Sequence, residues 1–228
     1  MLVQYASDLH LDQLTSYIPS ELIIPKSEIL ILGGDICHII SAVHHTAFFK
    51  YINKSFQYII YVPGNHEFYS DCYSIGELEI HLKHFLKSYS NIIYLNNSSV
   101  FIEDMLFTGS CLWCDPTNEP PPWFLIDITS EEIKNMHYES VDYLKKVSCL
   151  QYRKHVIITH YPPVMIPTKR NRKYDDYYQN SDIYLPYQPP IWIFGHIHEN
   201  ICMKTDSTVY LSNQRKDKKY NSGMTFSV

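Results

Sequence analysis

Short clusters of metal-ligating residue types follow apolar runs at five places in this chain. The runs, at 2–3, 29–32, 59–62, 156–158 and 191–194, are rich in Ile, Leu, Val and aromatic residues. In order, the clusters are Asp8-Leu9-His10, Gly33-Gly34-Asp35, Gly64-Asn65-His66-Glu67, Thr159-His160 and Gly195-His196-Ile197-His198. Continuous apolar runs are typical of strands buried on both faces of a sheet, and functional groups gather in the loops at the carboxyl ends of such strands. We therefore expect the five clusters to converge in space.

The rest of the chain predicts a layered α/β architecture, because apolar runs of strand length alternate with helical patterns. Helices are expected after Ser41, with Val43 among the inward residues, over about 74–89, and from a capping box of Thr129 and Glu132 to about 150. Short strands are expected between 91 and 110, and a strand pair at 201–204 and 208–211. No segment is long enough to be a linker between domains, so we expect one domain over 1–228.

Composition limits the class of protein. The chain has 228 residues, 45% of them hydrophobic and 19% charged, which is typical of a soluble globular protein. A net charge of −5 argues against general affinity for nucleic acid or anionic membranes. The first residues lack a signal-peptide pattern, no apolar run is long enough to span a membrane, and the six cysteines are scattered. These features predict a cytoplasmic protein that does not associate with membranes.

The clusters have the residue types of a site for two divalent metal ions. Such a site needs a carboxylate that contacts both ions, and Asp35 suits this role because Gly33 and Gly34 let the backbone approach closely. Asp8 and His10 are two residues apart and would point to the same side of an extended segment. His196 and His198 repeat this spacing.

Carboxylate, imidazole and amide donors, the last from Asn65, suit Mn²⁺, Fe²⁺, Ni²⁺ or Zn²⁺ better than Ca²⁺, and we favour Mn²⁺. A hydroxide that bridges two such ions would serve as the nucleophile at phosphorus, so no nucleophilic side chain is required. His66 is next to Asn65 and is the natural general acid for the leaving oxygen.

The ordered set of clusters resembles the pattern of the calcineurin-like metallophosphoesterase superfamily, D-x-H, G-D, G-N-H-(D/E), H and G-H-x-H. The start of the chain and its length are similar to those of compact, uncharacterised bacterial and viral members without a cap domain. The resemblance implies a four-layer αββα sandwich with two central mixed sheets and the clusters along one rim. It also implies one ion held by Asp8, His10, Asp35 and His198, the other held by Asp35, Asn65, His160 and His196, and His66 as the proton donor.

One departure from the superfamily pattern bears on the substrate. The Ser/Thr protein phosphatases carry G-D-x-V-D-R-G at the second cluster, whereas here Asp35 is followed by Ile36-Cys37-His38-Ile39. The second aspartate, which orients the catalytic histidine, and the phosphate-binding arginine are both absent. The resemblance therefore favours phosphodiesters or small phosphomonoesters over phosphoproteins.

A basic and aromatic segment follows His160. Its residues Lys169, Arg170, Arg172 and Tyr174 are candidates for substrate binding, because cations neutralise phosphate and tyrosines stack on bases. A solvated loop explains the same residues equally well.

Two more assignments stay open. Glu67 either orients His66 or solvates its loop. His38 either packs structurally, which we favour, or reaches the rim of the site.

Together these features predict a phosphoester hydrolase with two metal ions, acting as a phosphodiesterase on nucleotide or nucleic-acid-type substrates. One alternative is a phosphomonoesterase that acts on small molecules or proteins. The other is a scaffold that keeps the fold for protein binding without catalysis.

We expect Cys111 and Cys114 to be structural, because no second cysteine pair accompanies this C-x-x-C segment.

Overall fold

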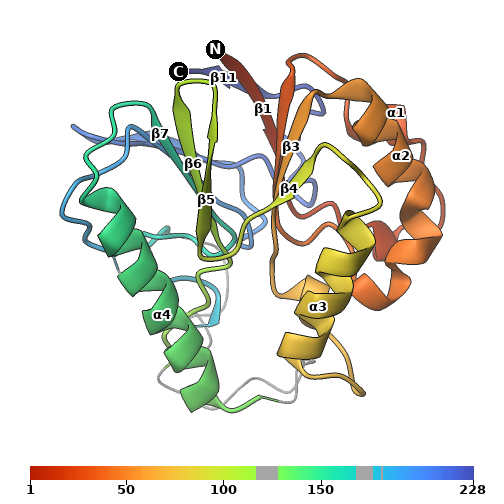
Figure 1. The fold of residues 1–228 in the computed structure, drawn as a ribbon, viewed down its shortest axis with the longest axis horizontal. Coiled ribbons are helices and arrows are strands. Elements are labelled where there is room, and N and C mark those ends of the chain that lie inside the picture. Colours follow the sequence, from red (N-terminus) through yellow and green to blue (C-terminus); the bar gives the residue numbers. More distant parts are fainter. Residues whose placement is uncertain (117–127, 168–176, 181) are drawn as a thin grey trace.

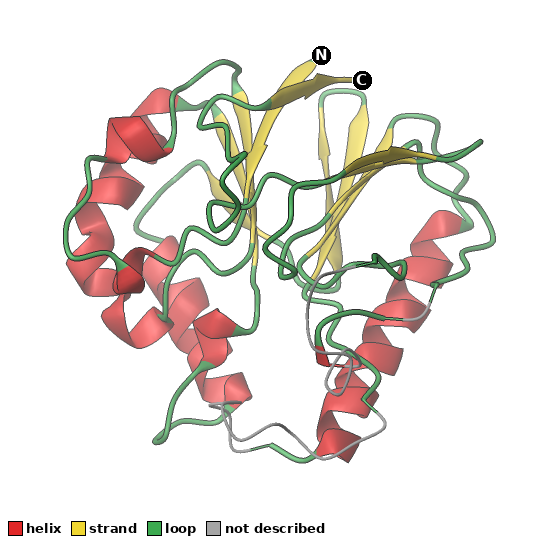
Figure 2. Cartoon of the chain, turned by 180° about the vertical axis from the view of Figure 1, so that it is seen from behind, coloured by secondary structure: helices red, strands yellow, loops and turns green. Residues whose placement is uncertain are grey.

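Two β-sheets lie face to face in the middle of the molecule, and helices cover the outer side of each sheet (Figures 1 and 2). The structure is a computed structural model that describes residues 1–116, 128–167, 177–180 and 182–228. The described strands form one five-stranded and one six-stranded sheet. This is the four-layer αββα sandwich that the resemblance implied.

The first sheet has the strand order β11-β1-β2-β3-β4. Its strands β1, β2, β3 and β4 are parallel, while β11 pairs antiparallel with β1. The strands are β11 (Thr225–Ser227), β1 (Leu2–Ala6), β2 (Ile29–Gly33), β3 (Tyr58–Val62) and β4 (Ile92–Tyr94), and the helices on their outer side are α1 (Pro19–Leu22), α2 (Thr46–Ser55) and α3 (Ile75–Leu86).

The second sheet has the strand order β5-β6-β7-β8-β10-β9. Its four central strands are parallel, and an antiparallel strand closes each edge. The strands are β5 (Ser98–Ile102), β6 (Met105–Ser110), β7 (His155–Thr159), β8 (Ile191–Ile193), β10 (Val209–Leu211) and β9 (Cys202–Lys204), and α4 (Ser130–Ser148) lies on the opposite side of the molecule from α2 and α3.

The alternation of side chains along each strand divides the core into layers. On β2, Ile29 and Ile31 pack between the two sheets, while Leu30 and Leu32 pack in the core beneath the helices. The strand is therefore buried on both faces, which is why it is a continuous apolar run in the sequence. Across the parallel strands, this packing fixes the positions of the loops that follow them.

Capping boxes begin the two long helices that flank the sheets. Thr129 caps α4 by accepting a hydrogen bond from the backbone N–H of Glu132, whose carboxylate accepts one from the backbone N–H of Thr129 in return. This is the capping box that the sequence predicted. Ser74 and Glu77 make the same reciprocal pair at the start of α3.

No helix in the described part of the chain combines the length and apolarity that crossing a bilayer requires.

The helix expected after Ser41 begins later than predicted. Residues Ile39–His45 form a 3₁₀ helix, η2, and the α-helix begins only at Thr46. The hydroxyl of Ser41 donates to the carbonyl oxygen of His38 at 2.9 Å instead of capping an α-helix. Because a 3₁₀ helix winds more tightly, Val43 falls on the outer side, with 61% of its surface exposed, and not in the core.

Candidate metal centre

Hydrogen bonds join the five clusters across the two sheets. The backbone N–H of Asp8 donates to the carbonyl oxygen of Gly34 at 2.9 Å, and that of Gly195 donates to the carbonyl oxygen of His160 at 2.9 Å. The carboxylate of Asp8 accepts from the backbone N–H of His196 at 3.0 Å. The backbone N–H of His66, after β3, donates to Oδ1 of Asp35 at 2.9 Å. The loops after β1, β2, β3, β7 and β8 therefore meet at one place, so that their side chains can act together.

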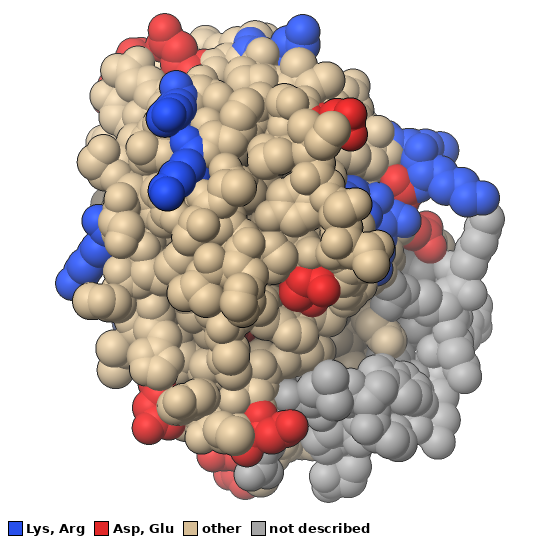
Figure 3. All heavy atoms as spheres, turned by 90° about the vertical axis from the view of Figure 1, so that its right-hand side faces the viewer, with Lys and Arg blue, Asp and Glu red and all other residues tan. Residues whose placement is uncertain are grey.

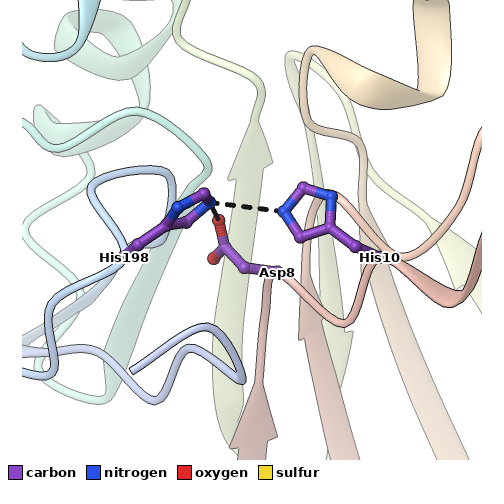
Figure 4. Close-up of side chains that lie close together, drawn as sticks. All are labelled: Asp8, His10 and His198. Atoms are coloured by element: carbon purple, nitrogen blue, oxygen red, sulfur yellow. Dashed lines mark hydrogen bonds and ion pairs between the residues drawn. The ribbon is translucent and has the colours of Figure 1, made fainter. Parts of the chain in front are cut away.

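The first group of potential metal ligands consists of Asp8, His10 and His198 (Figure 4). The Nε2 atoms of His10 and His198 are 3.3 Å apart, and Nε2 of His198 is 3.4 Å from Oδ1 of Asp8. One ligand atom from each of the three residues lies within 4.8 Å of the other two. The three side chains point toward a common centre, although they come from loops at opposite ends of the chain.

The second group consists of Asp35, His160 and His196. Nε2 of His160 is 3.2 Å from Oδ1 of Asp35 and 3.2 Å from Nδ1 of His196. Oδ1 of Asn65 is 3.1 Å from the same nitrogen of His160. The structure thus brings all four predicted ligands of the second ion into one cluster.

Asp35 lies between the two groups. Its Oδ1 faces His160 at 3.2 Å, while its Oδ2 faces Nε2 of His10 at 3.7 Å. Nε2 of His66 is 3.9 Å from Oδ2, and His66 forms a further group of potential ligand atoms with His10 and Asp35. The two oxygens of one carboxylate therefore face two different sets of nitrogens, which is the geometry that a bridging ligand requires.

The backbone at these loops is strained. Residues other than glycine rarely adopt positive φ, because Cβ approaches the carbonyl oxygen. Five of the potential ligands nevertheless do so, namely Asp8 (53°), His10 (44°), Asp35 (55°), His196 (70°) and His198 (55°). Strain of this kind persists only where the surrounding structure holds it, and it is typical of functional sites.

Two glycines leave space for these side chains. Gly34 has φ of +87°, and a Cβ on it would lie 2.5 Å from Nδ1 of His160. A Cβ on Gly195 would lie 2.6 Å from Oδ2 of Asp8. A larger residue at either position would displace a potential metal ligand.

The charges at the centre are buried and strongly coupled. Burial alone would raise the pKa of Asp35, but the imidazoles of His160 and His66 outweigh it and hold that pKa well below its usual range. Burial opposes a charge on His160 as well, yet Asp35 and Asp8 raise its pKa to about 9. By contrast, burial lowers the pKa of His10 to about 4. The carboxylates thus favour positive charge at the second group.

The donor atoms fit divalent cations. Nδ1 of His160 donates to the carbonyl oxygen of Gly33 at 2.9 Å, which directs Nε2 toward Asp35. A hydrogen bond of this kind commonly orients a metal-ligating imidazole. Carboxylate oxygens, imidazole nitrogens and the amide oxygen of Asn65 are the ligands that Mn²⁺, Fe²⁺, Ni²⁺ and Zn²⁺ accept in proteins.

His66 lies at the partly open side of the centre. It begins the short 3₁₀ helix η3 (His66–Phe68), and 21% of its side chain is exposed. Its ring packs against those of Tyr69 and His10, with centroids 4.4 and 4.5 Å away. His38, for which we favoured simple packing, reaches the rim of the site, because its Nε2 is 3.3 Å from Nδ1 of His66.

Glu67 has contacts at the centre that the sequence did not indicate. It is fully buried, so it does not solvate its loop. Its carboxylate accepts hydrogen bonds from the backbone N–H groups of Asp35, Ile36 and Gly64 at 2.9, 2.7 and 2.8 Å, and from the hydroxyl of Tyr61. Burial and the nearby Asp35 raise its pKa to about 7. Glu67 therefore joins the backbones of two clusters, a role that only the tertiary structure reveals.

The predicted substrate residues Lys169, Arg170, Arg172 and Tyr174 lie outside the described residues. Two tyrosines that follow them do reach the second group. The carbonyl oxygen of Tyr177 is 3.3 Å from Nε2 of His196, and the ring of Tyr178 lies 5.6 Å from that imidazole. Away from the centre, Cys111 and Cys114 are both buried.

Comparison with known sequences defines the class of protein. The calcineurin-like phosphoesterase family matches residues 3–200, a range that contains all five clusters. The chain therefore belongs to this family and is a phosphoester hydrolase that depends on divalent metal.

Individual proteins resemble this chain in sequence or in fold. Uncharacterized protein L509 of Acanthamoeba polyphaga mimivirus is 25% identical over 198 residues, which cover 73% of this chain and 71% of the viral protein. Phosphopantetheinyl hydrolase from Mycobacterium tuberculosis has a similar structure, with a TM-score of 0.78, 15% identity, and coverage of 98% of this chain and 95% of the other. TT1561 of Thermus thermophilus matches with a TM-score of 0.51, 12% identity, and coverage of 95% and 90%. At these identities, the structural likeness shows the fold alone.

Proposed function

We propose that this phosphoesterase uses two divalent ions and that Asp35 bridges them. The observation that carries the proposal is the position of its carboxylate, whose two oxygens face His160 on one side and His10 on the other. The first ion would be held by Asp8, His10, Asp35 and His198, and the second by Asp35, Asn65, His160 and His196. We propose Mn²⁺ as the ion, one of the divalent ions that such a mixture of oxygen and nitrogen donors can bind.

Ions at these positions would stabilise the charge that develops on the phosphoryl oxygens and lower the pKa of the attacking water. The chain supplies the remaining chemistry. His66 would protonate the oxygen that leaves phosphorus, because its Nε2 faces the centre and its ring is partly open to solvent. The hydrogen bonds between clusters hold the ligands in place before substrate binds, which reduces reorganisation during the reaction.

A phosphodiester of the nucleotide or nucleic-acid type is the proposed substrate. Histidine and not aspartate occupies position 38, and the arginine of the protein-phosphatase pattern is absent, so a phosphoprotein is disfavoured. The ring of Tyr178 beside His196 offers an aromatic surface on which a base could stack. On the side of the molecule that carries α2, Figure 3 shows lysines and arginines scattered among acidic residues and not gathered into one basic surface. The net charge of −5 also argues against general affinity for nucleic acid, so a nucleotide or a nucleic-acid end suits the chain better than a long duplex. From the sequence pattern, we propose the cytoplasm as its compartment.

The test is hydrolysis of bis(p-nitrophenyl) phosphate with added Mn²⁺. Asp35→Asn is expected to lower kcat/KM at least about 1000-fold, because several kcal/mol of metal-dependent stabilisation are lost. Asp206→Asn, at the turn between β9 and β10, is the matched control and should retain full activity. Full activity of Asp35→Asn would refute the proposal.

The same assay separates the alternatives. Faster turnover of p-nitrophenyl phosphate than of the diester would favour a phosphomonoesterase. No turnover, together with only trace metal by elemental analysis after incubation with Mn²⁺, would favour a scaffold. A panel of cyclic nucleotides, short oligonucleotides and a phosphopantetheinyl ester, the last suggested by the structural neighbour, would then identify the substrate class.

A further inference from the structure

We propose that His38 is the positioning residue for His66 and is itself held by Asp12. The inference rests on the proposed role of His66 as proton donor. His38 follows Asp35 by three residues, the position at which the protein-phosphatase pattern has its second aspartate. An imidazole thus stands where a carboxylate would orient the catalytic histidine.

The contact between the two histidines is direct. Nε2 of His38 is 3.3 Å from Nδ1 of His66, and the two rings are stacked, with centroids 5.5 Å apart and an angle of 29° between their planes. Among the described residues, His38 is the side chain that forms a hydrogen bond with this nitrogen of His66. The bond occupies Nδ1, so Nε2 remains for the side of the ring that faces Asp35, 3.9 Å away.

His38 is in turn attached to the loop of the first cluster. Its backbone N–H donates to Oδ1 of Asp12 at 3.3 Å, and its Nε2 is 3.7 Å from Oδ2 of Asp12. Asp12 lies on the 3₁₀ helix η1 (Leu11–Gln13), directly after the loop that carries His10. A continuous set of side chains therefore leads from Asp12 through His38 and His66 to Asp35.

The backbone N–H of His66 donates to Oδ1 of Asp35 at 2.9 Å, which holds the chain but does not orient the ring. His66 lies on a single 3₁₀ turn, and part of its side chain is exposed. Tyr69 packs against the ring, but that contact does not fix which nitrogen points toward the centre. A hydrogen bond to Nδ1 does fix it, because the two nitrogens of an imidazole become distinct once one of them is bonded. His38 belongs to none of the groups of potential metal ligands, so it would act through His66 and not on a metal ion.

The leaving group provides a direct test. Diphenyl phosphate and bis(p-nitrophenyl) phosphate are both diaryl phosphodiesters and differ in the para-nitro groups, but phenolate is the poorer leaving group and depends more on protonation. His38→Ala should lower kcat for diphenyl phosphate by about 10–100-fold, the usual effect of losing a residue that orients a site group. For bis(p-nitrophenyl) phosphate the loss should be no more than about 3-fold. KM and bound Mn²⁺ should stay unchanged.

Three further variants make the result specific. His38→Gln keeps an amide near Nδ1 of His66 and should restore most of the loss for diphenyl phosphate. His44→Ala removes an exposed histidine on the neighbouring η2 and should change neither substrate. Asp12→Asn should give a smaller loss with the same leaving-group preference as His38→Ala.

The variant His66→Ala separates this inference from the proposed function. If His66→Ala slows both diesters equally, His66 is not the proton donor and the proposed function is wrong in that respect. If His66→Ala affects diphenyl phosphate selectively but His38→Ala affects both diesters equally, or neither, the positioning role of His38 is refuted while the role of His66 stands.

Discussion

Replacing His155 by glutamine is expected to reduce the fall in the free energy of unfolding that the protein shows as the pH is lowered from 7 to 5. His155 begins β7, only 1% of its surface is exposed, and its Nε2 is 2.8 Å from the hydroxyl oxygen of Thr108. Burial lowers its pKa from 6.5 to about 4. The folded protein therefore keeps this imidazole neutral at pH values at which the unfolded chain would protonate it.

The two pKa values set the direction and size of the effect. Because the folded value is the lower one, the stabilising effect is present above pH 6.5 and is lost as the pH falls toward 4. A single group with these two pKa values removes about 2 kcal/mol from the free energy of unfolding between pH 7 and pH 5. In His155→Gln no proton binds, and the amide can still form a hydrogen bond with Thr108.

Urea unfolding at pH 7 and pH 5, with chelator present to remove effects of metal binding, measures the difference. The wild-type free energy of unfolding should fall by about 2 kcal/mol more than that of His155→Gln. Contributions from the other titrating groups cancel in this comparison, because both proteins share them. His84→Gln, on the exposed side of α3, is the control and should behave like the wild type. An equal fall in His155→Gln and the wild type would show that burial does not keep His155 neutral.

Two further predictions concern the support of the metal centre. Glu67→Gln should lower the free energy of unfolding by about 2–4 kcal/mol and weaken Mn²⁺ binding, because an amide cannot accept all the hydrogen bonds that the carboxylate accepts. Urea unfolding and Mn²⁺ titration test this, and unchanged values in both would contradict it. Gly195→Ala should reduce bound Mn²⁺, measured by elemental analysis, because the new Cβ would lie 2.6 Å from Oδ2 of Asp8. Gly76→Ala, whose Cβ would meet no atom within 4 Å, is the control and should bind Mn²⁺ normally.

The architecture was largely predictable because burial on both faces leaves a clear trace in the sequence. The run 29–32 is apolar at every position, since alternate side chains pack against different layers. The capping box at Thr129 was equally visible, because it depends on residues three apart. The pairing of β11 with β1 was not foreseen. It joins Leu2 to Ser227, and no local pattern in a three-residue strand specifies such a partner.

In the candidate site too, the sequence predicted local features but not contacts between distant segments. The convergence of the ligand clusters followed from the rule that parallel strands end at one edge. The contacts of Glu67 with Asp35 and of His38 with His66 did not follow, because they join loops that are 32 and 28 residues apart in the sequence. Glu67 and His38 lie within or beside a recognised cluster, so the sequence indicated that they lie near the site. Their partners, however, depend on how two loops pack against each other. Sequence patterns thus identified which residues gather, and only the packing shows which of them support the others.

The same packing explains how the chain tolerates such a centre. Two buried carboxylates, Asp8 and Asp35, would repel each other without compensation, and several ligands have unfavourable positive φ angles. The loops are nevertheless held, because backbone N–H groups donate to Asp8, Asp35 and Glu67 from other clusters. The proton that the carboxylates favour on His160 supplies positive charge where a cation would bind. Hydrogen bonds between the loops therefore hold the ligands in position, so that the ligand arrangement does not depend on ion binding alone.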